Sequence, residues 1–179
     1  MLTIAPPDMV EVRANATFEA LMWAMARPGD GRHLPDAGLG GLIETLVDLE
    51  CTVFTDEPEL RARATATGAR LSDDPGDADH VFVSCLDDAE QWLITLRCGN
   101  ALYPDDGATL GAVARHGIGQ RLRLSGPGID GSKEAILDVS PAFWAMRARL
   151  CAYPEGFDML VVDGRSVIGI PRSTQVEVL

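Results

Sequence analysis

Three consecutive side chains near the carboxyl terminus have the chemistry of a phosphate site. Arg172 carries a planar guanidinium with a fork of donors, and Ser173 and Thr174 add two hydroxyls. Pro171 ends the apolar run before them, and residues 176–179 alternate like one more strand. Because the same triplet also suits a bend between two strands, the sequence leaves open whether it binds a ligand or only turns the chain.

Other polar residues extend this hypothesis to two further turns. Arg27 lies beside Pro28-Gly29 and is a second cation for a phosphate ester. Asp105 and Asp106 lie in the turn "YPDDG", where they either take part in chemistry or cap a strand. The predicted ligand- or partner-binding residues are therefore Arg27, Asp105, Asp106, Arg172, Ser173 and Thr174.

A glycine pattern after a predicted strand looks like a dinucleotide-binding loop but lacks its supporting features. Gly126 to Gly131 read "GPGIDG", which matches G-x-G-x-x-G. Pro127 removes one of the N–H groups that would face a pyrophosphate, and no acidic residue follows about twenty positions later. We interpret the segment as a glycine-rich turn.

Spacing elsewhere predicts no catalytic residue, no metal ligand and no cofactor site. The three histidines, His33, His80 and His116, are scattered and lack a zinc spacing. The acidic stretch 72–79 lacks the twelfth-position acid of a calcium loop. Lys133 is the only lysine, and so the only possible Schiff-base partner for pyridoxal phosphate, but it lies in a polar turn.

Helical and strand signals mix along the chain and predict the scaffold that must position these residues. Helices are expected at 17–29, 40–50, 56–69, 87–99 and 140–150. Strands are expected at 51–54, 80–85, 108–114, 119–126, 134–139, 157–162, 166–170 and 175–179. The fold class is α/β, with one domain over 1–179 and a mixed sheet flanked by helices in three α/β/α layers.

Side-chain patterns predict which faces of these elements are buried. The first helix should pack through Phe18, Leu21, Met22 and Met25, and the second through Leu42, Leu46 and Leu49. In the strand at 119–126, two leucines alternate with two arginines, which predicts one wet face. Ser140 before Pro141 predicts a capped start for the last helix.

The charge balance narrows the possible partners. The chain has 27 acidic and 15 basic residues and a formal charge of −12, which argues against nucleic acid and against anionic membranes. No apolar run is long enough to span a bilayer, and the amino terminus does not read as a signal peptide. The four cysteines show no C-x-x-C spacing, which predicts thiols in a reducing cytoplasm.

Five ordered motifs carry a resemblance to a known family. They are "FEALMWAMARPG", "YPDDGATL", "LRLSGPGI", "YPEGFDMLVV" and "IPRSTQVEVL". Together they resemble the PhnH subunit family of bacterial carbon–phosphorus lyase, across nearly the whole chain. The resemblance implies a fold like the large domain of pyridoxal-phosphate-dependent transferases, without the cofactor.

The resemblance also implies a function in phosphonate catabolism. Family members are core subunits beside G-, I- and J-type partners and form homodimers when alone. Their assembly couples ATP and an alkylphosphonate to give α-D-ribose 1-methylphosphonate 5-triphosphate, with release of adenine, and this subunit would assist without a catalytic residue. In this setting the last strand should dock into the sheet, and Arg172, Ser173 and Thr174 should line a partner or dimer contact, or a cleft for a phosphorylated ligand.

Two alternatives stay open. One is a stand-alone transferase of pyridoxal-enzyme ancestry, against which the position of Lys133 argues. The other is a module that binds phosphate esters through the Arg172 triplet and Arg27.

Overall fold

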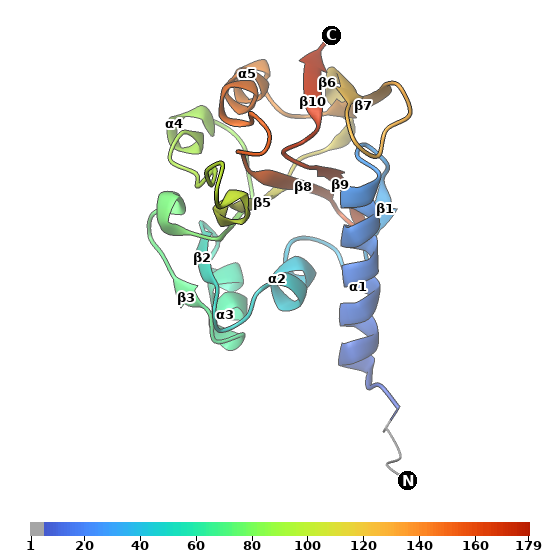
Figure 1. Cartoon of the computed structure of the whole chain (residues 1–179). Coiled ribbons are helices and arrows are strands. Elements are labelled where there is room, and N and C mark those ends of the chain that lie inside the picture. The colour runs from blue at the N-terminus through green and yellow to red at the C-terminus, as the bar shows by residue number, and fades with distance from the viewer. Residues whose placement is uncertain (1–5) are drawn as a thin grey trace.

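The computed structural model describes residues 6–179, and its centre is a mixed sheet (Figure 1). The sheet has the strand order β1-β9-β8-β5-β4-β2-β3. These strands are β1 (Arg32–His33), β9 (Ser166–Ile170), β8 (Asp158–Asp163), β5 (Thr109–Val113), β4 (His80–Val83), β2 (Thr52–Thr55) and β3 (Arg70–Leu71). From β8 to β3 neighbouring strands are parallel, and β9 is antiparallel to both of its neighbours. The predicted mixed sheet is confirmed.

The central strands are apolar on both faces because helices or strands cover both. Along β8, Met159 and Val161 belong to one core cluster, whereas Leu160 and Val162 belong to the other. The predicted hairpin between β8 and β9 is confirmed, with Gly164 at a φ of 56° in its turn.

One face of the sheet is covered by α1 (Met9–Ala26), α2 (Gly40–Leu46) and α3 (Pro58–Ala66). The first helix is longer than predicted, because Asp8 and Glu11 form a capping box ahead of it. Its amino-terminal part extends beyond the body of the protein (Figure 1).

The predicted buried stripe of α1 is wrong in part. The buried residues are Thr17, Ala20, Leu21 and Ala24. By contrast, Phe18 and Met22 are 55% and 47% exposed. The helix crosses β9 so closely that a Cβ added to Gly169 would lie 2.5 Å from the Ala24 carbonyl oxygen. Only small side chains fit that contact, so the large ones point outward.

The other face is covered by α4 (Glu90–Leu93), α5 (Pro141–Leu150) and a second sheet. The second sheet has the order β10-β6-β7, from β10 (Gln175–Val178), β6 (His116–Ser125) and β7 (Lys133–Leu137). The predicted helices are present on this face, but they share it with a second sheet that the three-layer α/β/α prediction does not include. The last strand also pairs with β6 instead of docking into the main sheet.

Several local predictions are confirmed within this second layer. Leu122 and Leu124 are fully buried, while Arg121 and Arg123 pair on the outer side with glutamates of β7 and β10. Residues 126–131 form a turn between β6 and β7. The Ser140 hydroxyl accepts a hydrogen bond from the Phe143 N–H at 3.1 Å and caps α5.

Other elements are shorter than predicted. The helix expected at 87–99 is reduced to α4, and the second helix ends at Leu46, so that Leu49 is 72% exposed. Short 3-10 turns, η1 (Pro75–Asp77) and η2 (Pro104–Asp106), form in two proline-bearing acidic segments. Over residues 6–179 no helix is both long and apolar enough to cross a bilayer, and no cluster of metal-ligating side chains forms.

Candidate functional site

The turn between β9 and β10 contains the predicted Arg172 triplet. The Arg172 guanidinium donates from Nη2 and Nε to Asp158 Oδ2, at 2.6 and 3.2 Å, and from Nη1 to the Pro104 carbonyl. Its backbone N–H donates to Asp158 Oδ1 at 2.8 Å. Arg172 therefore joins three segments: its own turn, the first residue of β8 and the turn at η2.

The electrostatics of Arg172 follow from these contacts. Burial alone would lower the pKa of the guanidinium, but its hydrogen bonds to Asp158 outweigh that effect and raise the pKa. The side chain is 14% exposed. Asp158 and Pro104 take three of the five N–H donors of the guanidinium, and the carboxylate compensates its charge, which weakens the case for a phosphate at Arg172.

A second arginine, Arg147, which the sequence patterns did not indicate, also binds the turn between β9 and β10. Arg147 of α5 is 2% exposed and donates to the backbone carbonyls of Thr174 at 3.1 Å, Pro171 at 2.7 Å and Ile170 at 3.4 Å. Burial lowers the pKa of this guanidinium. The segment "RARL" read as an ordinary helix end, so no sequence signal marked Arg147 as buried.

The two hydroxyls of the triplet have different surroundings. Thr174 is 2% exposed, and its hydroxyl has no partner among the described residues. Ser173 is partly exposed and lines a cavity of about 350 Å³ with Arg147, Arg172, Cys151 and Tyr153. Burial raises the pKa of the nearby Cys98 thiol, which keeps it protonated near neutral pH.

The structure brings the predicted acidic turn to Arg172 but places Arg27 elsewhere. Asp106 lies 3.7 Å from Arg97, whose guanidinium also contacts Asp79. Asp105 is exposed. Arg27 follows α1 and lines a separate cavity of about 460 Å³ beside the glycine-rich turn.

Lys133 lines the Arg27 cavity as well, and its surroundings are polar. Its ammonium pairs with Asp30, and its side chain is 40% exposed. A Schiff-base lysine is usually activated in an apolar pocket, and the partly exposed, ion-paired setting of Lys133 differs from such a pocket.

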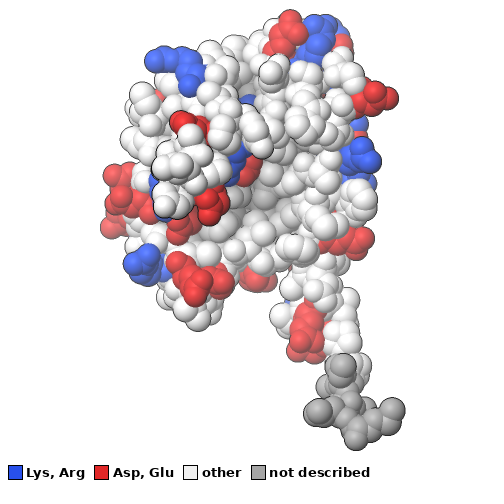
Figure 2. Space-filling model, viewed as in Figure 1, with Lys and Arg blue, Asp and Glu red and all other residues white. Residues whose placement is uncertain are grey.

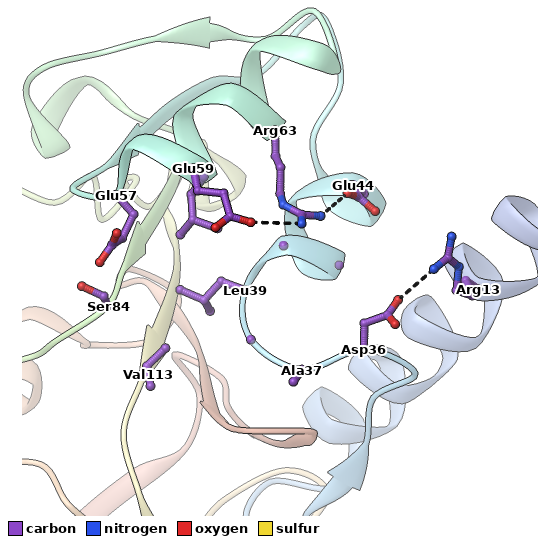
Figure 3. Close-up of a pocket in the computed structure, with 14 residues that line it drawn as sticks. Arg13, Asp36, Ala37, Leu39, Glu44, Glu57, Glu59, Arg63, Ser84 and Val113 are labelled. Carbon is purple, nitrogen blue, oxygen red and sulfur yellow. Dashed lines mark hydrogen bonds and ion pairs between the residues drawn. The ribbon is translucent and has the colours of Figure 1, made fainter.

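A larger cavity, of about 620 Å³, opens at the carboxyl ends of β2, β4 and β5 (Figure 3). The helix after β2 covers one face of the sheet and the helix after β4 covers the other, so the chain changes direction there. Ligands of open α/β sheets bind at such a switch point. No motif marked this cavity, because its lining comes from five separate chain segments.

Charge makes this cavity a poor phosphate site. Figure 3 shows Arg63 between Glu44 and Glu59, with distances of 2.6 and 3.2 Å, and Arg13 beside Asp36 at 3.6 Å. Glu57 adds a further carboxylate near Ser84. Both arginines are already paired and carboxylates outnumber them, so the cavity repels anions.

Comparisons with known proteins match this chain along almost its whole length. The family described as bacterial phosphonate metabolism protein (PhnH) matches residues 8–177. The chain belongs to the PhnH family. It is also 33% identical over 172 residues to the protein named "Putative C-P lyase subunit protein HtxG" of Stutzerimonas stutzeri, covering 92% of this chain and 86% of that protein.

Family membership confirms the resemblance carried by the five sequence motifs. The motifs "YPDDGATL", "YPEGFDMLVV" and "IPRSTQVEVL" converge in space, because Arg172 contacts both Pro104 and Asp158. In this PhnH-family chain they therefore form one junction between the two sheets. A role in phosphonate metabolism with the carbon–phosphorus lyase complex follows from the family and the relative.

Proposed function

We propose that the chain is an assisting, non-catalytic subunit of the carbon–phosphorus lyase core complex. It would support the ATP-dependent formation of α-D-ribose 1-methylphosphonate 5-triphosphate with release of adenine. The observation that carries the proposal is the family match over residues 8–177, together with a relative named "Putative C-P lyase subunit protein HtxG". We also expect a cytoplasmic protein that is a homodimer alone and binds G-, I- and J-type subunits.

The distribution of side chains supports a role in assembly. Arg172, the cation that the sequence singled out for a phosphate, is instead used in internal contacts with Asp158 and Pro104. Large apolar side chains, in contrast, remain exposed on α1. Exposed apolar patches of this kind mark contacts with other proteins.

The test is the mass of the purified protein by light scattering, alone and after co-expression with the G-, I- and J-type subunits of the same system. A dimer alone that enters a larger complex of fixed stoichiometry is the expected result. A protein that stays separate from all three subunits would refute the proposal.

A specific observation favours one second candidate, a module that binds phosphate esters. The cavity of about 350 Å³ is lined by Arg147, Arg172 and the partly exposed Ser173. Calorimetry with ATP, using Arg172→Met as the comparison, separates this function from a purely assembling one. Heat of ATP binding in the wild type that is lost in Arg172→Met would support phosphate-ester binding. If ATP gives no heat of binding with either protein, this function is excluded.

The other alternative, a stand-alone transferase of pyridoxal-enzyme ancestry, has weaker support. The likeness to the large domain of those enzymes stays a prediction. Lys133, its only possible Schiff-base residue, is paired with Asp30. An absorption band that appears with pyridoxal phosphate and disappears in Lys133→Ala would revive this alternative.

A further inference from the structure

The outward face of α1 carries large apolar side chains that the fold itself does not use. Phe18 and Met22 are 55% and 47% exposed. The helix packs on the sheet through an adjacent face, which carries Thr17, Ala20, Leu21 and Ala24. Large apolar side chains grouped on a surface mark a contact with another molecule.

A groove of about 270 Å³ lies beside this face, and we call it the α1 groove. Its apolar walls come from α1, α2 and β8. They are formed by Phe18, Leu21, Met22, Met25, Leu46 and Leu160. Figure 2 shows the surface beside α1 as a hollow with few charged side chains. The groove can therefore receive a compact apolar group.

The polar residues of the groove carry little net charge. His80, Thr109 and Asp158, the first residues of β4, β5 and β8, also line it. The Asp158 carboxylate is compensated by Arg172 at 2.6 Å. Burial lowers the pKa of His80, which favours the neutral imidazole. An apolar occupant would therefore leave no unpaired charge beneath it.

Two acidic side chains lie next to residues that line the groove, and they suggest the charge of its occupant. Glu19 is exposed next to Phe18 on α1. Asp48 follows α2, and its charge acts on His80. A second copy of this chain would bring the same acids to the contact, and like charges facing each other oppose association. A partner with lysine or arginine around an apolar centre meets both requirements.

The exposed apolar area of the groove is large enough for the centre of an interface but too small for a whole interface. A buried aromatic side chain contributes about 150–250 Å², so the exposed half of Phe18 offers about 100 Å². A stable contact buries about 800 Å² on each partner. The α1 groove would supply the anchoring pocket, and surrounding surface would supply the rest.

We propose that the α1 groove receives an apolar anchor, flanked by lysine or arginine side chains, from a companion subunit of the carbon–phosphorus lyase assembly. This inference rests on the proposed function and adds the surface and the chemistry of the partner. It assigns the outward side chains of α1 a binding role that the fold alone leaves unexplained.

The test compares two variants in assembly with the G-, I- and J-type subunits. Phe18→Glu/Met22→Glu places charge in the α1 groove. Leu102→Glu is the matched control, because Leu102 is 84% exposed and lies outside the groove. Light scattering of co-expressed proteins should show loss of the complex for the groove variant alone. Titration of purified subunits should show binding weakened by roughly 30-fold or more, as for a central interface residue.

A charge variant tests the rim of the groove separately. Glu19→Lys should weaken binding several-fold, and raising the salt concentration should weaken the wild-type contact in the same direction. Stronger binding by Glu19→Lys would overturn the assignment of a basic partner. The thermal midpoint of each variant alone should stay close to that of the wild type, since all substituted side chains are exposed.

Different failures have different meanings. If the wild type enters the complex and the groove variant does so equally well, the inference is wrong while the proposed function stands. If the groove variant only loses self-association, the occupant is a second copy and the inference is again wrong. If the wild type itself never enters the complex, the proposed function fails, and the inference that rests on it fails too.

Discussion

Replacing Asp158 by asparagine should destabilise the fold at the junction around Arg172. A second, more exposed ion pair with the same geometry shows how much of this loss depends on burial. Asp158 accepts three hydrogen bonds from Arg172, at 2.8, 3.2 and 2.6 Å. Asparagine keeps one acceptor oxygen and removes the negative charge. The Arg172 and Asp158 side chains are only 14% and 23% exposed, so the guanidinium would lose its counter-charge in a poorly hydrated place.

The expected size of the effect follows from the burial. Breaking a fully buried ion pair costs about 3–5 kcal/mol, whereas an exposed pair is worth about 0–1 kcal/mol. For this partly buried pair we expect Asp158→Asn to lower the free energy of unfolding by about 2 kcal/mol. In a chain of this size that corresponds to a melting temperature lower by about 4–8 °C.

The more exposed ion pair used for comparison joins Arg115 and Asp138. Arg115 donates from Nε and Nη2 to one carboxylate oxygen at 2.8 and 2.6 Å, which is the same fork that Arg172 makes. The Arg115 and Asp138 side chains are 64% and 41% exposed. Asp138→Asn should therefore change the free energy of unfolding by less than about 1 kcal/mol.

Urea unfolding followed by tryptophan fluorescence measures both variants on the same scale. A double-mutant cycle with Arg172→Met should give a coupling of about 1.5 kcal/mol between Arg172 and Asp158. Equal losses in Asp158→Asn and Asp138→Asn, or a coupling near zero, would refute the reasoning. Arg172 would then be free enough for the ligand role that the sequence suggests.

Three further variants probe other parts of the fold. Arg147→Met should lower the free energy of unfolding by about 3 kcal/mol in urea titrations, because three buried or partly buried backbone carbonyls lose their donor. A loss below about 1 kcal/mol would mean that water replaces the guanidinium. Burial lowers the pKa of His80, so the unfolded chain binds more protons as the pH falls below about 6.5, and acid weakens the fold. Unfolding measured at pH 7.5 and 5.5 should show a smaller acid loss in His80→Gln than in the wild type, and equal losses would contradict this. Gly111→Ala should cost about 2 kcal/mol in thermal unfolding, since the added Cβ would lie 2.6 Å from the Phe82 ring, whereas a neutral result would mean that the ring moves aside.

Local rules predicted the elements of this fold better than their packing. The β8–β9 hairpin, the glycine-rich turn and the Ser140 cap each depend on a few neighbouring residues, and each formed where expected. The second sheet was not predicted, because the pairing of β10 with β6 joins residues about fifty positions apart. Such a pairing leaves no periodic signal within either strand.

The candidate site was predicted in composition but not in role. The sequence indicated a cationic turn at 172–174 and an acidic turn at 105–106, and the structure joins them through Arg172 and the Pro104 carbonyl. No sequence pattern indicated Asp158 as the partner of Arg172, or Arg147 as a donor to the same turn. Both contacts depend on where separate strands and helices meet. The chemistry of a residue type is visible in a sequence, but the partner that occupies it is not.

The error on α1 is the most informative one. Periodicity ranks residues by hydrophobicity, and it chose Phe18 and Met22 as the buried face. The close crossing at Gly169 instead selects small side chains, and it buries Thr17, Ala20 and Ala24 on a stripe one position away. The apolar stripe read from the sequence therefore exists, but the sheet of this chain leaves Phe18 and Met22 on it uncovered. A helix with a second, uncovered apolar face is suited to contact another protein, which is the role proposed above for Phe18 and Met22.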